Sequence, residues 1–338
     1  YIHSKFIVIW ACNSVSTNLH HWTIVNDAKK KGAKVVVIDS YKSRTAKEAD
    51  WHICPKPGTD GALAVSIINY IINNDLVDNE YVSKYTNGFD ELKNHVQGKD
   101  SSWASKITGI PADQIEKLAN EISTQQPVGI RIGVALERHN GGGQTIRAVT
   151  CIPALTGAWK HVGGGITQFP VWEHPYKFDV ICRPDWIPKG TRVINALQIG
   201  RALLGENIDN SIPIKSMMCW NANPVTQAPE TEKIIEGLKR EDLFLVSAEH
   251  FISDTASYAD ILLPASMGAE HEDMILSWGH LYLTYNEKCV EPPGEAVPNY
   301  EIFRKLAKLM GYKDNQFLWS DEKCFKIYVD WTAPASKG

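Results

Sequence analysis

The chain has 338 residues, of which 43% are hydrophobic and 22% charged, and its formal net charge is −4 at pH 7. This length predicts two or three domains of roughly 150 residues each, and the composition is that of a folded globular chain. The charge argues against a nucleic-acid partner, and the apolar runs, such as residues 6–10 and 35–38, are far shorter than the roughly 20 residues of a membrane-spanning helix.

Seven cysteines are spread along the chain without a Cys-x-x-Cys pair or a tight cluster. The odd count and the wide spacing predict reduced, mostly buried thiols rather than disulfides or a zinc or iron–sulfur site within this chain. There is no initiator Met and no signal peptide, and the chain is strand-like by Phe6. We therefore expect part of a longer protein, with a cytoplasmic location as the default and a periplasmic one if an export signal precedes the chain.

Strands and helices alternate in the first part of the chain. Residues 6–10 are predicted as a buried strand, 19–31 as a helix that ends at Gly32, and 34–39 as a buried parallel strand. A short helix follows, and then an apolar helix over residues 62–72. This order of elements predicts a doubly wound α/β lobe with right-handed βαβ connections.

Two sequence segments recur at an offset of 210 residues. Trp10-Ala11-Cys12-Asn13 returns as Trp220-Asn221-Ala222-Asn223, and residues 45–50 return as 255–260. Between these anchors both copies contain a strand, a loop, a helix and a second strand. Two anchors with one offset predict two homologous, Rossmann-like lobes of the nucleotide-binding type.

The region between the two copies has a different character. Residues 80–124 are predicted to be helical, 127–136 to be a strand, and 144–156 to be an apolar helix that Pro153 kinks. A Pro- and Trp-rich stretch, 168–189, shows no periodicity.

A domain boundary is therefore expected near residue 190. Residues 1–190 form the first α/β lobe with its helical insertion, and 191–312 the second, with an irregular β segment at about 268–297. Strand-like pieces such as 280–285 are expected there, 298–310 is predicted as the closing amphipathic helix, and 313–338 as a tail or interface segment.

Small polar side chains follow the first strand, at the edge of the sheet where helix amides favour phosphate. They are Asn13, Ser14, Thr17 and Asn18. Such a loop can equally be a plain connection. Arg44, after the second strand, is either a phosphate ligand or a surface charge.

Two carboxylates are placed to bind a nucleoside. Asp39 ends the second strand, where a carboxylate commonly binds a ribose, or else it caps a turn. The turn Pro57-Gly58-Thr59-Asp60 ends in a carboxylate that can accept two adjacent N–H groups of guanine, or that caps the next helix.

Further candidates lie in the second copy and near a glycine loop. Asn223-Pro224 fixes the second loop, and Glu249 and His250 follow its second strand, although a lone His there is more often structural. Arg138 and His139 adjoin a glycine loop that allows close approach of a large cofactor. The chain has no Gly-x-Gly-x-x-Gly, Walker, Gly-x-Ser-x-Gly or His-Glu-x-x-His motif, which argues against the NAD, ATP, acyl-hydrolase and zinc-protease classes.

Together these motifs resemble the molybdopterin oxidoreductase superfamily of the dimethyl-sulfoxide-reductase type. The family pattern of strand-Trp-Gly-x-Asn-Pro, Ile-Asp-Pro-Arg, Thr-Ala-x-x-Ala-Asp and Pro-Gly-Thr-Asp is similar to residues 9–14, 38–40, 45–50 and 57–60. Leu155-Thr156-Gly157 with Gly163-Gly164-Gly165, and Ala259-Asp260-Ile261-Leu262-Leu263-Pro264 with Glu270, resemble further signatures in family order.

The resemblance implies a bis-molybdopterin guanine dinucleotide across the two lobes, holding molybdenum or tungsten through dithiolene sulfurs. Asn13, Ser14 and Asn18 would line one phosphate loop, and Asp39, Ser40 and Asp60 would bind a guanosine end. Asn223, Glu249 and His250 would serve the second nucleotide, and Gly133, Arg138 and His139 would approach a pterin. The complete set of cofactor-binding candidates is Trp10, Asn13, Ser14, Thr17, Asn18, Asp39, Ser40, Arg44, Pro57, Gly58, Asp60, Gly133, Arg138, His139, Asn221, Asn223, Pro224, Glu249, His250 and Thr255.

The implied function is two-electron redox chemistry or oxygen-atom transfer on a small-molecule substrate, with an electron-transfer subunit as a candidate partner. In the family the four-iron four-sulfur cluster and the metal ligand precede the strand of Trp10, and another cofactor-binding domain follows the closing helix. The chain is thus expected to be a central portion that is inactive alone, and no metal ligand or catalytic acid or base is assigned. It departs from the pattern at Ala11, which replaces Gly, and at Ser14, which replaces Pro.

Two other functions stay open on the sequence. One is a metal-free scaffold or fragment of the same superfamily, against which the retained Asp60 argues. The other is an unrelated pair of Rossmann-like lobes that use a nicotinamide or thiamine cofactor, which the missing glycine fingerprint disfavours.

Overall fold

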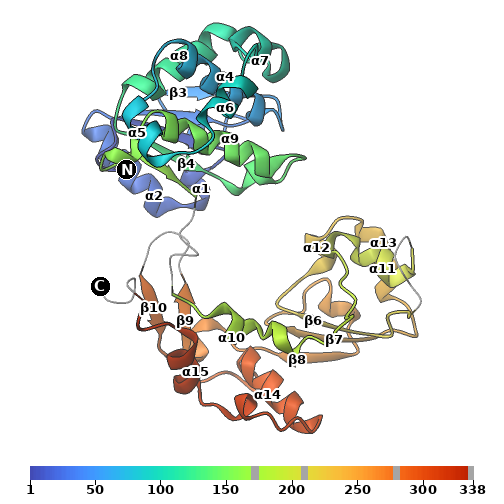
Figure 1. The fold of residues 1–338 in the computed structure, drawn as a ribbon. Coiled ribbons are helices and arrows are strands. Elements are labelled where there is room, and N and C mark those ends of the chain that lie inside the picture. Colours follow the sequence, from blue (N-terminus) through green and yellow to red (C-terminus); the bar gives the residue numbers. More distant parts are fainter. Residues whose placement is uncertain (169–174, 207–211, 277–281, 334–338) are drawn as a thin grey trace. The chain divides into compact units, whose positions relative to one another are not determined.

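The structure is a computed structural model that describes residues 1–168, 175–206, 212–276 and 282–333. Outside a short stretch that is not described, its contacts divide the chain into a first unit that ends at Pro170 and a second that begins at Val171 (Figure 1). The boundary expected near residue 190 therefore lies inside the second unit.

Backbone pairing explains this position of the boundary. The Lys177 N–H donates to the Tyr328 carbonyl at 2.8 Å, and the Asp330 N–H donates to the Pro175 carbonyl at 2.7 Å. Helix α10 (Phe178–Cys182) also packs on α15 (Asp321–Tyr328). The stretch expected to be a tail thus contains a helix that packs within the second unit.

The first unit is built on a five-stranded parallel sheet with the order β3-β2-β1-β4-β5. Its strands are β1 (Phe6–Trp10), β2 (Lys34–Ile38), β3 (Trp51–Ile53), β4 (Val128–Ile132) and β5 (Gly165–Thr167). The continuous apolar sequence of β1 fits its central place, because a central parallel strand is covered on both faces. The mixed α/β class and the parallel sheet predicted from the sequence are confirmed.

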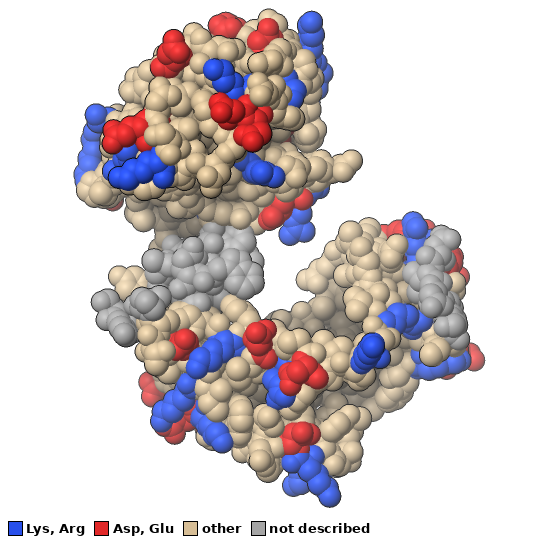
Figure 2. Space-filling model, viewed as in Figure 1, with Lys and Arg blue, Asp and Glu red and all other residues tan. Residues whose placement is uncertain are grey.

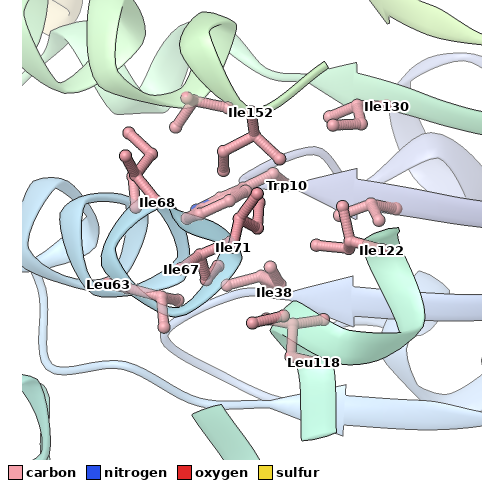
Figure 3. Close-up of a cluster of buried hydrophobic side chains, with 14 of the residues drawn as sticks. Trp10, Ile38, Leu63, Ile67, Ile68, Ile71, Leu118, Ile122, Ile130 and Ile152 are labelled. Carbon is pink, nitrogen blue, oxygen red and sulfur yellow. The ribbon is translucent and has the colours of Figure 1, made fainter. Parts of the chain in front are cut away.

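Alternate residues of the strands enter two separate cores. Val8, Trp10 and Val36 pack against helices α4 (Asp60–Asn73), α8 (Ala112–Thr124) and α9 (Gly142–Leu155). Figure 3 shows Ile67 and Ile71 of α4 and Ile152 of α9 around the Trp10 side chain. On the other face Ile7, Ile9 and Val35 pack against α2 (Leu19–Lys30) and α3 (Arg44–Glu48). The period of two along each strand divides the apolar residues between the two faces.

Shorter helices complete the first unit. The predicted helical insertion contains α5 (Asn79–Tyr85), α6 (Phe89–His95) and α7 (Ser101–Thr108) before α8, and α1 (Ser14–Thr17) precedes α2. The strand predicted over 127–136 was too long, because β4 ends at Ile132 and a 3-10 helix spans Val134–Glu137. Helix α9 ends two residues after Pro153, so the proline lies in its last turn.

The second unit has a three-stranded parallel sheet in the order β6-β7-β8. The strands are β6 (Ser216–Trp220), β7 (Phe244–Glu249) and β8 (Ile261–Pro264). One face packs on α11 (Ile199–Leu204), α12 (Pro224–Gln227) and α13 (Thr231–Leu238).

An antiparallel pair and two helices come after this sheet. Strand β9 (Asp273–Leu276) pairs with β10 (Leu283–Asn286), so the predicted strand 280–285 is found from 283, and residues 280 and 281 lie outside the described ones. Helix α14 (Asn299–Leu309) matches the helix predicted over 298–310, but α15 follows it.

Charged side chains of both signs are mixed over the surface of each unit on the face in Figure 2. This mixture agrees with the small net charge of −4. Within the described ranges, no helix is both long and apolar enough to cross a bilayer.

Candidate functional site

An asparagine and a threonine brace the loop that follows β1. Asn13 Oδ1 accepts hydrogen bonds from Thr45 N at 3.3 Å and from Thr45 Oγ1 at 2.9 Å, and Thr45 Oγ1 accepts one from Val15 N at 3.0 Å. Asp50 Oδ2 accepts from Val35 N at 2.7 Å, which ties the end of α3 to β2. Ala11 has φ of 52°, a left-handed conformation that turns the chain out of the strand.

The second unit contains the same set of bonds 210 residues later. Asn223 Oδ1 accepts from Thr255 N at 3.2 Å and from Thr255 Oγ1 at 2.7 Å, and Thr255 Oγ1 accepts from Val225 N at 3.1 Å. Asp260 Oδ2 accepts from Leu245 N at 2.7 Å, and Asn221 has φ of 51°. We call each set, Asn13–Thr45–Asp50 and Asn223–Thr255–Asp260, a loop frame.

A cavity of about 290 Å³ lies in the first unit, where the carboxyl ends of its parallel strands meet. The loops that follow four strands line it: Ala11 and Asn13 after β1; Asp39, Ser40 and Tyr41 after β2; Pro55, Pro57, Gly58 and Asp60 after β3; Ala135, Leu136 and His139 after β4. Seven of these residues were predicted from the sequence: Asn13, Asp39, Ser40, Pro57, Gly58, Asp60 and His139.

The two carboxylates of the cavity are held differently. Burial raises the pKa of Asp39, and hydrogen bonds from the backbone of Tyr41 and Ser40 act against that rise. Asp39 therefore also serves the turn, as the alternative interpretation expected. Asp60 Oδ1 accepts a hydrogen bond of 2.7 Å from the Trp10 indole nitrogen, while Thr59 occupies the N-cap of α4. The expectation that Asp60 caps the helix is wrong, because it is the first helical residue.

Several predicted residues form the wall behind the cavity or the nearby loop rather than its lining. Trp10 is completely buried and reaches the site only through its bond to Asp60. Thr17 Oγ1 donates to the Asn13 carbonyl at 3.1 Å, and Asn18 Oδ1 caps α2 by accepting from His21 N at 3.2 Å. Arg44 begins α3 and is exposed.

Ser14 does not present its hydroxyl to the cavity. The side chain is completely buried, with Oγ 3.0 Å from His21 Nδ1 and 3.5 Å from Cys12 Sγ. Burial, assisted by the charge of Arg131, lowers the pKa of His21 from 6.5 to about 4, so the ring is neutral near pH 7. Ser14, which the resemblance places in the lining of a phosphate loop, therefore uses its hydroxyl inside the protein.

Gly133 and Arg138 lie in the segment that follows β4. The Gly133 N–H donates to the Trp10 carbonyl at 2.8 Å, and a Cβ at this position would lie 1.8 Å from the Ala11 carbonyl oxygen. Gly133 thus lets two strand ends approach closely. Arg138 is exposed and ends the 3-10 helix.

The candidates of the second unit surround its own loop frame. Pro224 is buried as the first residue of α12, Asn221 and Asn223 lie in the loop before it, and Thr255 is completely buried. Glu249 ends β7, and its Oε1 accepts from His250 N at 2.8 Å. His250 Nε2 lies 3.1 Å from the Ser266 carbonyl, so the imidazole has a structural partner.

A larger cavity of about 690 Å³ lies in the second unit, but none of the predicted residues lines it. Its wall is mostly aromatic, and an ion pair of 2.7 Å joins Arg304 of α14 to Asp321 of α15 there. Among the residues that the structure describes, no group of three or more His, Cys, Asp or Glu side chains is placed to hold a metal ion.

The sequence missed five residues that line the smaller cavity: Ala11, Tyr41, Pro55, Ala135 and Leu136. Ala135 and Leu136 were assigned to a strand that ends before them. Tyr41 was overlooked although it follows Asp39 and Ser40 directly, and its place just after a parallel strand is the signal that could have found it.

A parallel sheet covered by helices on both faces, with a polar cavity at the carboxyl ends of its strands, defines an α/β protein. The family model "Molybdopterin oxidoreductase" matches residues 2–309. The chain is 40% identical to a probable oxidoreductase, YoaE, of Bacillus subtilis over 97% of its length and 48% of that protein. It is 30% identical to the dimethyl sulfoxide reductase DmsA of Escherichia coli over 91% of its length and 43% of that protein.

A solved structure with a similar fold is the acetylene hydratase of Pelobacter acetylenicus, with a TM-score of 0.78 and 23% identity. That likeness covers 97% of this chain and 52% of the hydratase. The chain belongs to the molybdopterin oxidoreductase family. It spans about half the length of the curated relatives that it matches.

The smaller cavity offers hydrogen-bond acceptors to a small polar ligand. Its lining offers two carboxylates, an amide, two hydroxyls and an imidazole, and it contains no Lys or Arg. Carboxylates accept the N–H and O–H groups that a purine and a ribose present, whereas a phosphate needs donors. The volume of this cavity, about 290 Å³, lies just below the usual range of about 300–1,000 Å³ for small-molecule sites, so it has room for a small ligand and not for a whole dinucleotide.

Proposed function

We propose that this chain is the central cofactor-binding portion of a molybdenum or tungsten oxidoreductase that binds molybdopterin guanine dinucleotide. The observation that carries the proposal is the convergence of Asp39 and Asp60 on one cavity, at the carboxyl edge of a parallel sheet, in a member of this family. When bound, the metal–dithiolene group supplies two-electron redox chemistry or oxygen-atom transfer.

The residues of the cavity bind and orient the nucleoside. Asp39 accepts from the ribose hydroxyls, because it directly follows β2 and lines the cavity. Burial raises the pKa of Asp39, and the hydroxyl donors of a ligand would offset the cost of holding its charge. Asp60 accepts from the N–H groups of guanine through Oδ2, while Trp10 fixes Oδ1. Ser40 and Asn13 add a hydroxyl and an amide at the same edge.

The two loop frames support two homologous lobes, each of which serves one nucleotide. The same hydrogen bonds recur at an offset of 210 residues, and Ala11 and Asn221 both have a left-handed backbone conformation. This correspondence is hard to explain if the two lobes arose independently. The second nucleotide would lie by Asn221, Asn223, Glu249 and His250. Iron–sulfur ligands, a metal ligand and an electron-transfer partner are assigned to no described residue.

The test uses the complete gene product, made in a host supplied with molybdenum. Oxidative extraction releases fluorescent pterin and guanine nucleotide, which are quantified per chain beside the metal. Asp60→Asn and Asp39→Asn should each lower all three, and Asp90→Asn, an exposed aspartate on α6, should not.

Wild-type content in both cavity variants would overturn the assignment of the first lobe. A wild-type protein without pterin, guanine nucleotide or metal would instead favour the metal-free scaffold.

A further inference from the structure

Tyr41 is a large aromatic residue at the cavity that neither the sequence nor the proposed function uses. It follows Asp39 and Ser40 in the loop after β2, lines the cavity, and is 59% exposed. An exposed aromatic ring leaves apolar surface in contact with water, which is unfavourable. The place of the Tyr41 ring beside a polar cavity therefore needs an explanation.

The tyrosine is held at both ends by residues of the same cavity. Its backbone N–H donates to the Asp39 carboxylate, and its hydroxyl accepts from Asn13 Nδ2 at 3.4 Å. Asn13 is in turn fixed by Thr45. The ring is thus anchored at the cavity wall before any ligand binds, which reduces the rotamer entropy lost on binding.

The chemistry of the remaining lining leaves a place for a stacking group. The carboxylates of Asp39 and Asp60 can accept hydrogen bonds from donors at the edges of a nucleoside, but a carboxylate does not stack on the face of a base. His139 is the other planar ring of the lining, and it lies beside the Pro57-Gly58 turn, where a Cβ on Gly58 would be 3.4 Å from its Nδ1. Aromatic rings stack on the faces of nucleic-acid bases with little base specificity.

We propose that Tyr41 is the stacking platform for the purine base of the bound nucleotide. It supplies affinity that is common to all purines, whereas Asp60 supplies the preference for guanine. This inference rests on the proposed function, because it assumes that the cavity receives the nucleoside end of the cofactor.

The test measures nucleotide binding rather than turnover. The complete gene product is prepared from a host that cannot make the pterin, and GMP and IMP are titrated by calorimetry. IMP keeps the purine ring and lacks the exocyclic amine that Asp60 would bind. Tyr41→Ala should weaken both nucleotides by the same factor, about 5- to 150-fold. Asp60→Asn should weaken GMP more than IMP.

Two further variants separate the ring from other effects. Tyr41→Phe keeps the ring and loses the bond to Asn13, so its affinity should stay within about threefold of wild type. Tyr85→Ala removes a tyrosine of similar exposure, 61%, on α5 outside the cavity, and should change nothing.

The outcomes distinguish the inference from the proposal beneath it. Unchanged binding in Tyr41→Ala, or equal losses in Tyr41→Phe and Tyr41→Ala, overturns the stacking role, while the Asp60→Asn result still supports the site. A wild-type protein that binds neither GMP nor IMP overturns the nucleoside site and the stacking role together.

Discussion

The sheets of the two units begin with the same local structure but bury their first strand to different extents. All five residues of β1 are completely buried, because β1 lies in the middle of its sheet and helices cover both faces. Strand β6 lies at the end of the described three-stranded order, and Trp220, the counterpart of Trp10, is 49% exposed. A loop frame therefore needs only one βαβ unit, whereas the burial of the strand depends on elements from later in the chain.

The difference in burial between β1 and β6 arises from the segment that follows the third strand along the chain in each unit. After β3 the first unit continues into α4, whose side chains cover Trp10, and Asp60 at its start accepts the indole hydrogen bond. After β8 the second unit continues into a 3-10 turn, Gly268–Glu270. Trp220 contacts Phe303 of α14, with ring centroids 5.0 Å apart. Burial in the second unit thus comes from a helix that lies much later in the chain.

The largest expected effect contrasts the two tryptophans. Trp10→Ala should lower the free energy of unfolding of the first unit by about 3–5 kcal/mol, because it opens a cavity in a closed core and leaves Asp60 without its donor. Trp220→Ala should cost about 1–2 kcal/mol in the second unit, since half of that ring is already in water. Urea denaturation with hydrogen exchange of peptides from each unit measures both values; equal costs would contradict the comparison.

The next effect depends on pH and belongs to the first unit alone. The pKa of His21 falls from 6.5 in the unfolded chain to about 4 in the fold, so between these values the unfolded chain binds a proton that the folded chain does not. The contribution of neutral His21 to the free energy of unfolding is therefore fully present above pH 6.5. It is lost as the pH falls towards 4, and the full loss is on the order of 3 kcal/mol. The counterpart of His21 in the second unit, 210 residues later, is Thr231, which does not titrate.

Unfolding free energies of the first unit from urea denaturation at pH 7.5 and 5 should differ by about 2 kcal/mol from this cause, because pH 5 is still above the folded pKa of about 4 and part of the loss comes below it. In His21→Gln the pH dependence should shrink by that amount, whereas His20→Gln, a change at the exposed neighbouring histidine, should keep it. An unchanged slope in His21→Gln would mean that other groups carry the acid sensitivity.

A smaller effect tests what the units share. Asn13→Ala and Asn223→Ala each remove the acceptor for the N–H and hydroxyl of a buried threonine, and should cost about 1–3 kcal/mol in their own unit. The two costs should agree within about 0.5 kcal/mol if the frames are equivalent. Asn120→Ala, at an exposed position of α8, is the control, and local hydrogen exchange is the readout.

The sequence predicted the strands of the first sheet better than the walls of the cavity. Residues 6–10 and 34–39 were assigned as strands because buried parallel strands are continuous apolar runs, and β1 and β2 have nearly those bounds. Asp39 was chosen as a candidate because it ends a predicted strand, and Asp60 because it ends the Pro57-Gly58-Thr59-Asp60 turn. The whole set of site residues stays a prediction.

Other features depended on long-range contacts that no local pattern encodes. The bond between Trp10 and Asp60 joins residues 50 apart, and the buried pair of Ser14 and His21 depends on the packing of α2. Strand β4 ends at Ile132, where Gly133 closely approaches the carbonyl of Ala11 in the loop after another strand, β1. The boundary between the units follows from the backbone pairing of residues 175–177 with residues 328–330. A stretch without periodicity gives no local signal that predicts such a long-range pairing.

The smallest expected effect concerns the left-handed residue of each loop. Ala11 carries a Cβ at φ of 52°, which costs a non-glycine residue about 1–2 kcal/mol, whereas Asn221 at φ of 51° is of a type that tolerates this region. Ala11→Gly should therefore stabilise the first unit by about 0.5–1 kcal/mol after the greater entropy of glycine in the unfolded chain is subtracted, and Asn221→Gly should change the second unit by less than that. Thermal denaturation followed by local hydrogen exchange resolves the two values. A loss of stability in Ala11→Gly would mean that the methyl group of Ala11, which packs beside the core around Trp10, contributes more than the backbone strain costs.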